Sequence, residues 1–339
     1  MRWIESAWYR PYLHPLLYLL VPLSALFSVV TSVRRLAFRW RLKRSYKAPV
    51  PVLMVGNISV GGTGKTPVVL ALVEWLQQHG WKPGIVTRGY GGQGPFPLLV
   101  ETTATAAECG DEPLLLAQRS GVPVIADPNR AQAAQQLLRD FPAVNVLISD
   151  DGLQHYALQR DLELIVVDGK RGIGNGWRLP CGPLREPLTR LKKADFVLLN
   201  GQPDGPGASA IAALTKAHSI STEARSWHRV SDGQKIDKPD GEPVTAIAAI
   251  GHPQRFFNTL LEQQIELAET ASFADHHAFT PADFRHFNRQ RPLLMTEKDA
   301  GKCRAFAQRH WYYLAINAQL PESFWQQLEL KLKGLTHDS

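Results

Sequence analysis

The sequence predicts an α/β protein with a largely parallel sheet, helices on both faces, a smaller second α/β unit and an apolar N-terminal segment. Short apolar runs alternate with helical patterns from residue 48 onward, as in parallel strands joined by helices. A stretch richer in Gly, Pro, Asp and Ser, residues 201–243, interrupts this alternation. We therefore expect a membrane-associating segment with a basic flank over residues 1–47, a core over 48–225 and a smaller C-terminal domain over 226–339.

The N-terminal segment combines an uncharged run with a strongly basic flank. Residues 12–33 carry no formal charge, a length sufficient to span a bilayer. Pro15 and Pro22 argue against one straight spanning helix. Seven of the 38 Lys and Arg residues follow at 34–47, and the other 31 balance the 31 acidic residues. Basic side chains beside an apolar run favour attachment to anionic lipid, either spanning or lying on the surface. A buried helix pair in a soluble protein remains an alternative.

The expected strands and helices of the core and of the second unit are predicted from the local pattern of apolar residues. Apolar runs predict strands and apolar positions at helical spacing predict helices. The core strands are expected at 51–57, 82–92, 122–127, 144–151, 162–169 and 194–201, with helices at 65–80, 111–121 and 130–141. The second unit is expected to hold strands at 244–251, 292–299 and 311–318, with helices at 253–263, 280–289 and 321–334.

The stretch "VGNISVGGTGKTP", residues 55–67, is typical of a P-loop, because a strand leads through glycines into a helix opened by Lys and Thr. Backbone amides in such a turn approach phosphate oxygens, the lysine reaches the β- and γ-phosphates and the threonine hydroxyl binds Mg²⁺. Ser59 stands where the strict pattern has glycine. The predicted nucleotide-binding residues are Ser59, Val60, Gly61, Gly62, Thr63, Gly64, Lys65 and Thr66.

A P-loop also requires an acidic residue at the end of a neighbouring strand, since Mg²⁺ prefers oxygen ligands. Asp150 and Asp151 follow a buried apolar run. Adjacent residues leave a strand in opposite directions, so we expect one of the two carboxylates to face the metal more directly. The sequence does not rank them.

Two classes of nucleotide-binding protein are disfavoured. A GTPase switch carries an Asn-Lys-x-Asp motif on a late strand, and neither "VLLNGQPD" nor "LLMTEKD" fits it. ATP is therefore the expected nucleotide. A nucleic-acid-dependent ATPase would spread basic and aromatic residues through its folded domain, whereas the excess charge here is one flank. No nucleic-acid partner and no obligate protein partner is expected.

Several further motifs carry unusual residues without defining a role by themselves. "RGYGG" begins at Arg88 after a strand and is suited to holding an anion. "GDEP" places Asp111 at the start of a helix, where capping is the simplest interpretation. "FADHHAFT" contains His276 and His277, which composition alone assigns to a surface turn.

Taken together and in order, "VGNISVGGTGKTP", "RGYGG", "GDEP", "ISDDGLQH", "GPLREP", "FADHHAFT" and "MTEKDAGK" resemble the tetraacyldisaccharide 4′-kinases of lipid A biosynthesis. The resemblance extends over nearly the whole chain. It implies transfer of the ATP γ-phosphoryl group to the 4′-hydroxyl of a tetraacylated glucosamine disaccharide 1-phosphate, with Mg²⁺, at the cytoplasmic face of the inner membrane. The acceptor is then a membrane-embedded glycolipid.

The resemblance also implies residue roles. Lys65 acts in catalysis, and Asp111 and His276 form an acid–base pair that contacts the acceptor. Glu186 is implied as a metal ligand beside Thr66, Asp150 and Asp151, and Arg88 as a group near substrate phosphate. With Asp111 in the first predicted domain and His276 in the second, we expect closure of the two domains to bring this pair together.

Overall fold

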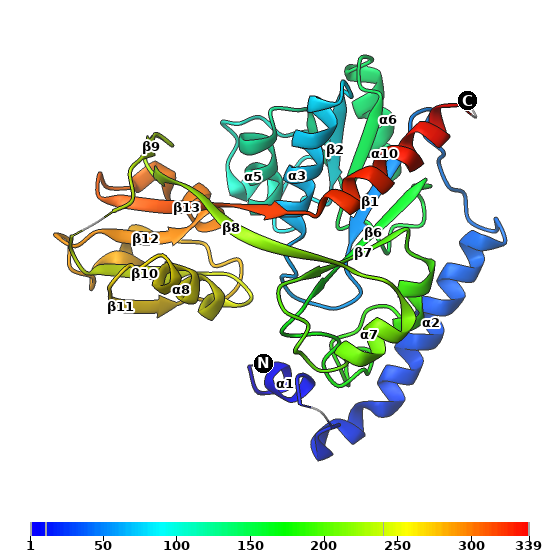
Figure 1. Cartoon of the computed structure of the whole chain (residues 1–339), viewed down its shortest axis with the longest axis horizontal. Coiled ribbons are helices and arrows are strands. Elements are labelled where there is room, and N and C mark those ends of the chain that lie inside the picture. Colours follow the sequence, from blue (N-terminus) through cyan, green and yellow to red (C-terminus); the bar gives the residue numbers. More distant parts are fainter. Residues whose placement is uncertain (1, 11, 240, 338–339) are drawn as a thin grey trace. The chain divides into compact units, whose positions relative to one another are not determined.

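The computed structural model describes residues 2–10, 12–239 and 241–337 (Figure 1). The chain forms two compact units that are discontinuous in sequence. The first comprises residues 1–88, 129–222 and 318–339, and the second comprises 89–128 and 223–317. The sequence had predicted continuous segments, 48–225 and 226–339. The composition change near residues 201–243 marks one crossing between the units. The other crossings have no such signal, because residues 88 and 128 lie in connections between elements and residue 317 lies within a strand, Trp311–Gln319.

The first unit contains a parallel sheet with its P-loop strand near the centre. Its strand order is β2-β5-β1-β6-β7-β8, and every neighbouring pair in this series is parallel. Leu53, Met54 and Val55 of β1 are fully buried, which is why this run has no polar alternation. The strands are β1 Val52–Gly56, β2 Pro83–Thr87, β5 Val146–Asp150, β6 Leu162–Asp168, β7 Phe196–Asn200 and β8 His218–Arg229, the last of which continues into the second unit.

Two helices of the first unit begin directly after a residue that is typical of the position before a helix, a glycine and an asparagine. α3 (Lys65–Gln78) follows Gly64 and packs against β1, β2 and β5. α6 (Arg130–Asp140) is capped by Asn129, whose side chain accepts from the amide of Gln132. Apart from the N-terminal segment, the other helical elements of this unit are α7 Ala208–Leu214, the 3₁₀ turn Leu188–Lys193 and α10 Glu322–His337. The predicted fold class, largely parallel α/β with an apolar N-terminal helix, is confirmed.

The N-terminal segment forms α1 (Arg2–Trp8), a 3₁₀ turn (Pro15–Leu20) and the long helix α2 (Val21–Arg39), drawn in blue in Figure 1. Prolines occupy the first turns of the last two elements, where a missing amide donor costs no helical hydrogen bond. Together, Pro15–Arg39 is the one stretch among the described residues that is helical, long and apolar enough to cross a membrane.

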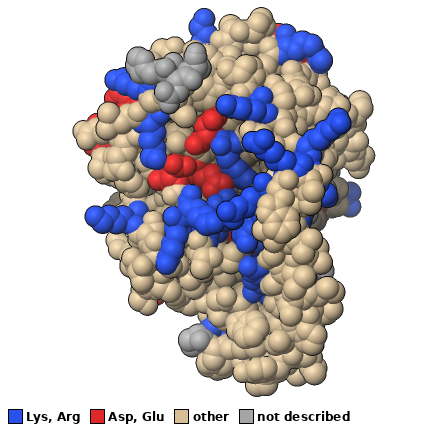
Figure 2. Space-filling view, turned by 90° about the vertical axis from the view of Figure 1, so that its right-hand side faces the viewer, with Lys and Arg blue, Asp and Glu red and all other residues tan. Residues whose placement is uncertain are grey.

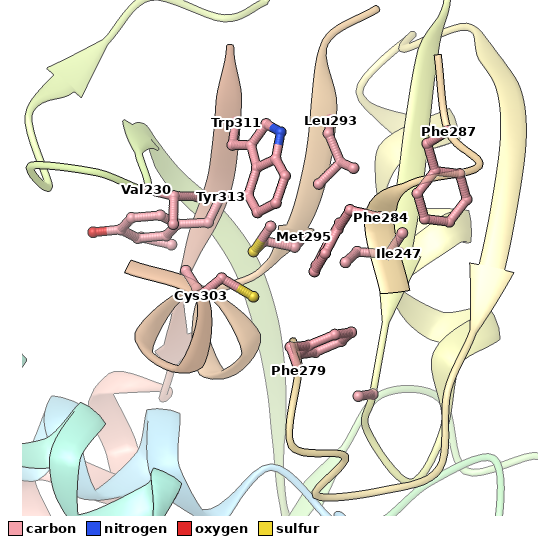
Figure 3. Packing of buried hydrophobic residues seen from close by; sticks show 13 residues of the cluster. Val230, Ile247, Phe279, Phe284, Phe287, Leu293, Met295, Cys303, Trp311 and Tyr313 are labelled. Carbon is pink, nitrogen blue, oxygen red and sulfur yellow. The ribbon is translucent and has the colours of Figure 1, made fainter. Parts of the chain in front are cut away.

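The second unit contains a four-stranded parallel sheet, β11-β10-β12-β13, and an antiparallel β3–β4 pair. One face of the parallel sheet covers an aromatic cluster that includes Phe279, Phe284 and Trp311 around Met295 (Figure 3). Its elements are β3 Leu98–Leu99, β4 Val124–Ala126, β9 Lys235–Ile236, β10 Val244–Ala248, β11 Leu267–Ser272, β12 Leu293–Thr296, β13 Trp311–Gln319, α4 Ala106–Cys109, α5 Asp111–Ser120, α8 Pro253–Glu262 and α9 Glu297–Cys303.

Several elements differ from the sequence-based expectation. The strand expected at 292–299 ends at Thr296, directly before α9, and the short elements β3, β9, α4 and α7 were not expected. β8 and β11 were not predicted, although both alternate between more and less buried positions. The helix expected at 280–289 is only a 3₁₀ turn, Pro281–Phe284, with a capping box between Thr280 and Asp283. Phe284 and Phe287 are both buried in the aromatic cluster, so a single turn satisfies the apolar spacing that had suggested a helix.

Candidate active site

The P-loop is a left-handed turn held by backbone and side-chain contacts. Gly61 and Gly64 have φ values of 95° and 90°, a region that favours glycine. The Asn57 side chain donates to the Gly61 carbonyl at 3.2 Å, and the Asn200 amide at the end of β7 donates to the Thr63 carbonyl at 3.0 Å. A side chain at position 64 would collide with Asn200. These contacts fix the loop just before Lys65 opens α3.

The two predicted aspartates at the end of β5 have different environments. Asp150 is the last, buried residue of the strand, and its carbonyl accepts from Arg130 at 3.1 Å. Asp151 has φ 45° and directs its carboxylate to Lys65, Nζ to Oδ1 3.4 Å, and to Arg185, Nη1 to Oδ2 3.4 Å. Asp151 therefore faces the P-loop lysine directly.

Opposing effects set the pKa of Asp151. Burial by itself raises it, but the charges of Lys65, Arg185 and Arg130 outweigh burial and lower the pKa to about 2. Asp151 is thus an anion at neutral pH, as a ligand for a divalent cation must be.

Glu186 lies beside the P-loop because its segment pairs with the loop. Ser59 forms a β-bridge with Leu184, and the amides of Arg185 and Glu186 donate to the Ile58 carbonyl at 2.7 and 3.3 Å. The buried Glu186 carboxylate accepts from the Tyr156 hydroxyl at 2.7 Å. Ser59, predicted as part of the cradle, therefore anchors the loop edge that carries Glu186.

No group of three or more His, Cys, Asp or Glu side chains arranged to hold a metal occurs among the described residues. Mg²⁺ in phosphotransferases takes only one or two protein oxygens, so a site for it does not require such a group. The Thr66 hydroxyl on the first turn of α3 and the anionic Asp151 on β5 have the required oxygen chemistry.

His155, in the "DDGLQH" motif, was not assigned a role from the sequence. Burial lowers its pKa, and the charges of Arg130, Arg88 and Arg34 lower it further, to about 4. The imidazole is therefore neutral at pH 7. The charges of three arginines, including the predicted residue Arg88, thus act on this one imidazole, and such a concentration of positive charge is suited to binding anions.

Asp111 and His276 form a direct pair. The His276 Nδ1 atom lies 3.1 Å from both Asp111 carboxylate oxygens, and the Tyr90 ring lies 5.1 Å from the imidazole. His276 has φ 61°, which a residue with a side chain seldom adopts. Its hydrogen bond to Asp111 raises the pKa of the imidazole. The structure thus brings together two residues 165 positions apart.

This pair corrects one expectation. Asp111 and His276 both belong to the second unit, since residues 89–128 fold with residues 223–317. Closure between domains is therefore not what joins them, and the prediction that it would be is wrong. The contact forms within one unit because α5 begins at Asp111 and the turn after β11 ends at His276.

The sequence also left two lysines without a role. Lys298 and Lys302 of α9 approach the Asp111 Oδ2 atom at 3.5 and 3.8 Å. Burial raises the pKa of Asp111, but the His276 hydrogen bond and the charges of Lys298, His276 and Lys302 outweigh it and lower the pKa to about 2. In the sequence, the only indication of this role is that the two lysines of "EKDAGK" are four residues apart, which places both on one face of a helix.

A parallel sheet with a P-loop after β1, a lysine opening α3 and an acidic end of β5 defines the chain as a P-loop phosphotransferase. A family model described as "Tetraacyldisaccharide-1-P 4′-kinase" (LpxK) matches residues 16–333. The chain belongs to this family of ATP-dependent kinases.

Close relatives cover the chain almost completely. A tetraacyldisaccharide 4′-kinase of Idiomarina loihiensis is 51% identical over 336 residues, covering 98% of this chain and 99% of the relative. One from Shewanella amazonensis is 47% identical over 331 residues, covering 95% and 93%. A solved structure from Aquifex aeolicus, described as an "apo" form of LpxK in complex with ATP, is 28% identical with a TM-score of 0.76, covering 94% of this chain and 99% of that one.

Proposed function

We propose that this chain transfers the γ-phosphoryl group of ATP to the 4′-hydroxyl of a tetraacylated glucosamine disaccharide 1-phosphate, a step of lipid A biosynthesis. The observation that carries this function is the P-loop with its Lys65–Asp151 pair in a chain that matches the kinase family over residues 16–333. The fold and site supply the phosphate donor, and the family supplies the acceptor.

The donor is held by the first unit. Loop amides from Gly61 to Gly64 and the N-terminus of α3 bind the phosphates, and Lys65 neutralises charge that develops on the transferred group. Thr66 and Asp151, with Asp150 and Glu186 nearby, would hold Mg²⁺, which would supply further positive charge for the phosphates. Phosphoryl transfer needs little more than such positioning and charge neutralisation.

The acceptor's proton is taken by the second unit. The 4′-hydroxyl oxygen forms a bond to the γ-phosphorus while the bond from that phosphorus to the β,γ-bridging oxygen breaks, and ADP leaves. The hydroxyl proton passes to the Asp111–His276 pair, in which Asp111 accepts it and His276 orients the carboxylate. A general base of this kind contributes roughly 10²–10⁴-fold to the rate.

The reaction itself is tested by product analysis. Purified protein is incubated with ATP, Mg²⁺ and the tetraacylated disaccharide 1-phosphate, and the product is analysed by mass spectrometry and phosphorus NMR. We expect the glycolipid to gain one phosphate at the 4′ position and ATP to become ADP. ATP consumption without a change in glycolipid mass would contradict the proposed acceptor, and a phosphate on another hydroxyl would contradict the position.

Membrane attachment through α2 completes the proposed function. An apolar stripe on α2 and the preceding turn is exposed: Leu19, Leu23, Leu26, Val30 and Val33 are 54–79% accessible. This spacing of three and four residues forms one helix face. Contiguous exposed apolar surface of this kind marks a membrane or protein interaction site.

The opposite face of α2 packs against the first unit. Ser24 donates to the Arg178 carbonyl at 2.9 Å, Arg178 donates to the Thr31 hydroxyl at 3.3 Å, and Arg35 lies 3.9 Å from Glu186. The Phe38 and Tyr156 rings are 5.9 Å apart. These contacts extend over about 21 Å of helix, so a spanning orientation would carry polar groups of the core into hydrocarbon about 30 Å thick. A helix lying in the membrane surface is therefore favoured.

Charge supports the same orientation. Figure 2 shows Lys and Arg side chains on one face of the molecule, next to a smaller group of Asp and Glu side chains. The basic residues from Arg34 to Lys47 directly follow the apolar stripe in sequence, and such residues add about 1 kcal/mol each near an anionic surface. We place the enzyme at the cytoplasmic face of the inner membrane, where ATP and the glycolipid acceptor are both available.

Replacing two residues of the stripe tests this attachment. We expect Leu26→Asn with Val30→Asn to weaken binding to vesicles of anionic phospholipid by roughly tenfold or more, because burying each side chain in lipid stabilises the bound state by about 1.5–3 kcal/mol. Sedimentation with vesicles measures the change. The matched control is Leu261→Asn with Leu330→Asn, two exposed leucines on α8 and α10 that are 54% and 70% accessible. Equal losses in both double variants would rule out a specific role for α2.

A further inference from the structure

The surroundings of Asp111 extend beyond its histidine partner. α9 presents two lysines, one turn apart, to the same carboxylate oxygen of Asp111. Both ammonium groups are largely withdrawn from water, with the Lys298 side chain 16% and the Lys302 side chain 7% accessible. Placing two lysines here costs solvation free energy, which only an anionic partner offsets.

Lys302 is fixed from behind by a buried carboxylate. Asp299 is fully buried, and its Oδ2 atom accepts from the Ala249 amide at 2.9 Å and from the Thr296 hydroxyl at 2.7 Å. The other oxygen, Oδ1, lies 2.8 Å from Lys302 Nζ. The Phe279 ring lies 5.3 Å from the same ammonium group, a cation–π contact. Thus β10 and the start of α9 determine where Lys302 points.

Lys298 links two segments that carry the proposed acid–base pair. Its ammonium group lies 3.3 Å from Glu112 Oε1 and 3.5 Å from Asp111 Oδ2, both on the first turn of α5. It also lies 3.8 Å from Asp275 Oδ1, and Asp275 accepts from the His276 amide at 3.1 Å. Lys298 therefore ties α5 to the turn that holds His276 in its left-handed conformation.

We propose that Lys298 and Lys302 are positioning residues for phosphoryl transfer: they hold the Asp111 carboxylate ionised and aimed, and Lys298 also fixes the turn that carries His276. The inference depends on the proposed role of Asp111 as the proton acceptor. Neither lysine needs to touch ATP or the acceptor.

Charge balance supports this arrangement. Asp111 faces His276 from the turn after β11 and both lysines from α9, with Glu112 and Cys109 as neighbours on its own side. Four carboxylates, Asp111, Glu112, Asp275 and Asp299, share two lysines. Asp111 and Asp299 are buried, whereas Glu112 and Asp275 are partly accessible. Losing one lysine leaves the negative charge around Asp111 undercompensated, and protonation of the Asp111–His276 pair relieves that repulsion most directly. The Lys298 charge also opposes protonation of His276. Removing it therefore favours protonation of both members of the pair.

The test is the pH dependence of kcat with saturating ATP and glycolipid, from about pH 5.5 to about pH 9. The acidic limb in this range is the first protonation of the Asp111–His276 pair, since the hydrogen bond to Asp111 raises the pKa of His276, whereas the pKa of Asp111 alone lies far below the range. We expect Lys298→Met and Lys302→Met to move this limb upward by about one pH unit, so that kcat falls about tenfold below the limb and partly recovers above it. Lys298→Arg and Lys302→Arg, which keep the charge, should retain the wild-type limb. The KM for ATP should stay constant, since the P-loop belongs to the other unit.

The control is Lys235→Met, an exposed lysine on β9 of the same unit. If the two lysines had a purely structural role, their replacement would lower kcat equally at every pH, and the methionine and arginine variants would lose the same activity. Either result overturns the inference. If Lys302→Met does not fold, the more accessible Lys298 decides the question by itself. Asp111→Asn separates this inference from the proposed function. If Asp111→Asn keeps the wild-type rate, Asp111 is not the proton acceptor. If Asp111→Asn is inactive but the pH dependence of kcat in the lysine variants matches wild type, only the role of the lysines is refuted.

Discussion

Lys65→Met is expected to lower kcat for transfer to the glycolipid by about 10³-fold. The lysine opens α3 directly after the left-handed Gly64, and it is the charged side chain of the loop itself. Removing a preorganised positive group that faces developing negative charge costs about 10²–10³-fold or more in a site shielded from water. A steady-state assay that follows phosphate transfer from labelled ATP measures the loss.

Lys82→Met is the matched control for this variant, because Lys82 is an exposed lysine of the same unit at the end of the segment that connects α3 to β2. It should keep the wild-type rate. Calorimetric titration with Mg²⁺ and ATP separates binding from chemistry in both variants. Transfer within a few-fold of wild type in Lys65→Met would show that the P-loop lysine does not act on the transferred group.

Asp111→Asn is expected to lower kcat by about 10²–10⁴-fold and to leave the affinity for ATP unchanged. The asparagine retains the size of the side chain but accepts no proton at neutral pH, so the acceptor hydroxyl would have to lose its proton to water. His276 would also lose the anion that raises its pKa. Rate measurements with saturating ATP and glycolipid, together with ATP titration, distinguish this loss from a binding defect.

Two controls are needed to interpret the activity of the Asp111→Asn variant. Glu262→Gln, at the exposed end of α8 in the same unit, controls for the loss of an acidic group. Thermal unfolding of Asp111→Asn reports whether Lys302, which loses a partner in this variant, destabilises the unit. A correctly folded variant with an unaltered kcat would exclude Asp111 as the general base.

The sequence predicted the phosphate-binding half of the site because that half is local. Residues 55–67 contain the strand end, the glycines and the helix start within one continuous stretch, so periodicity and motif spacing were sufficient. The rule that neighbouring residues leave a strand in opposite directions also predicted that Asp150 and Asp151 would differ. Proposing Asp151 as the more direct ligand required the structure, because its carboxylate pairs with Lys65 and its backbone is left-handed.

The acceptor half depends on long-range contacts that local patterns do not encode. Asp111 appeared to be a helix cap and His276 a surface residue until the family resemblance paired them. Even then, the pair was assigned to two domains, because the second unit combines residues 89–128 with residues 223–317. Lys298 and Lys302 lie in a quoted motif, but their function depends on a helix, α5, that is nearly 190 residues earlier in the chain.

The contact between Lys65 and Asp151 determines which ion pairs must change partners when a nucleotide binds. Lys65 pairs with a neighbour, Asp151, that is itself suited to a divalent cation. A bare triphosphate would have to separate the two and leave Asp151 beside four negative charges. On the proposed function, Mg²⁺ bound with the nucleotide would give Asp151 a new cation as Lys65 turns to phosphate, so the protein would favour the metal-loaded donor before any chemistry begins.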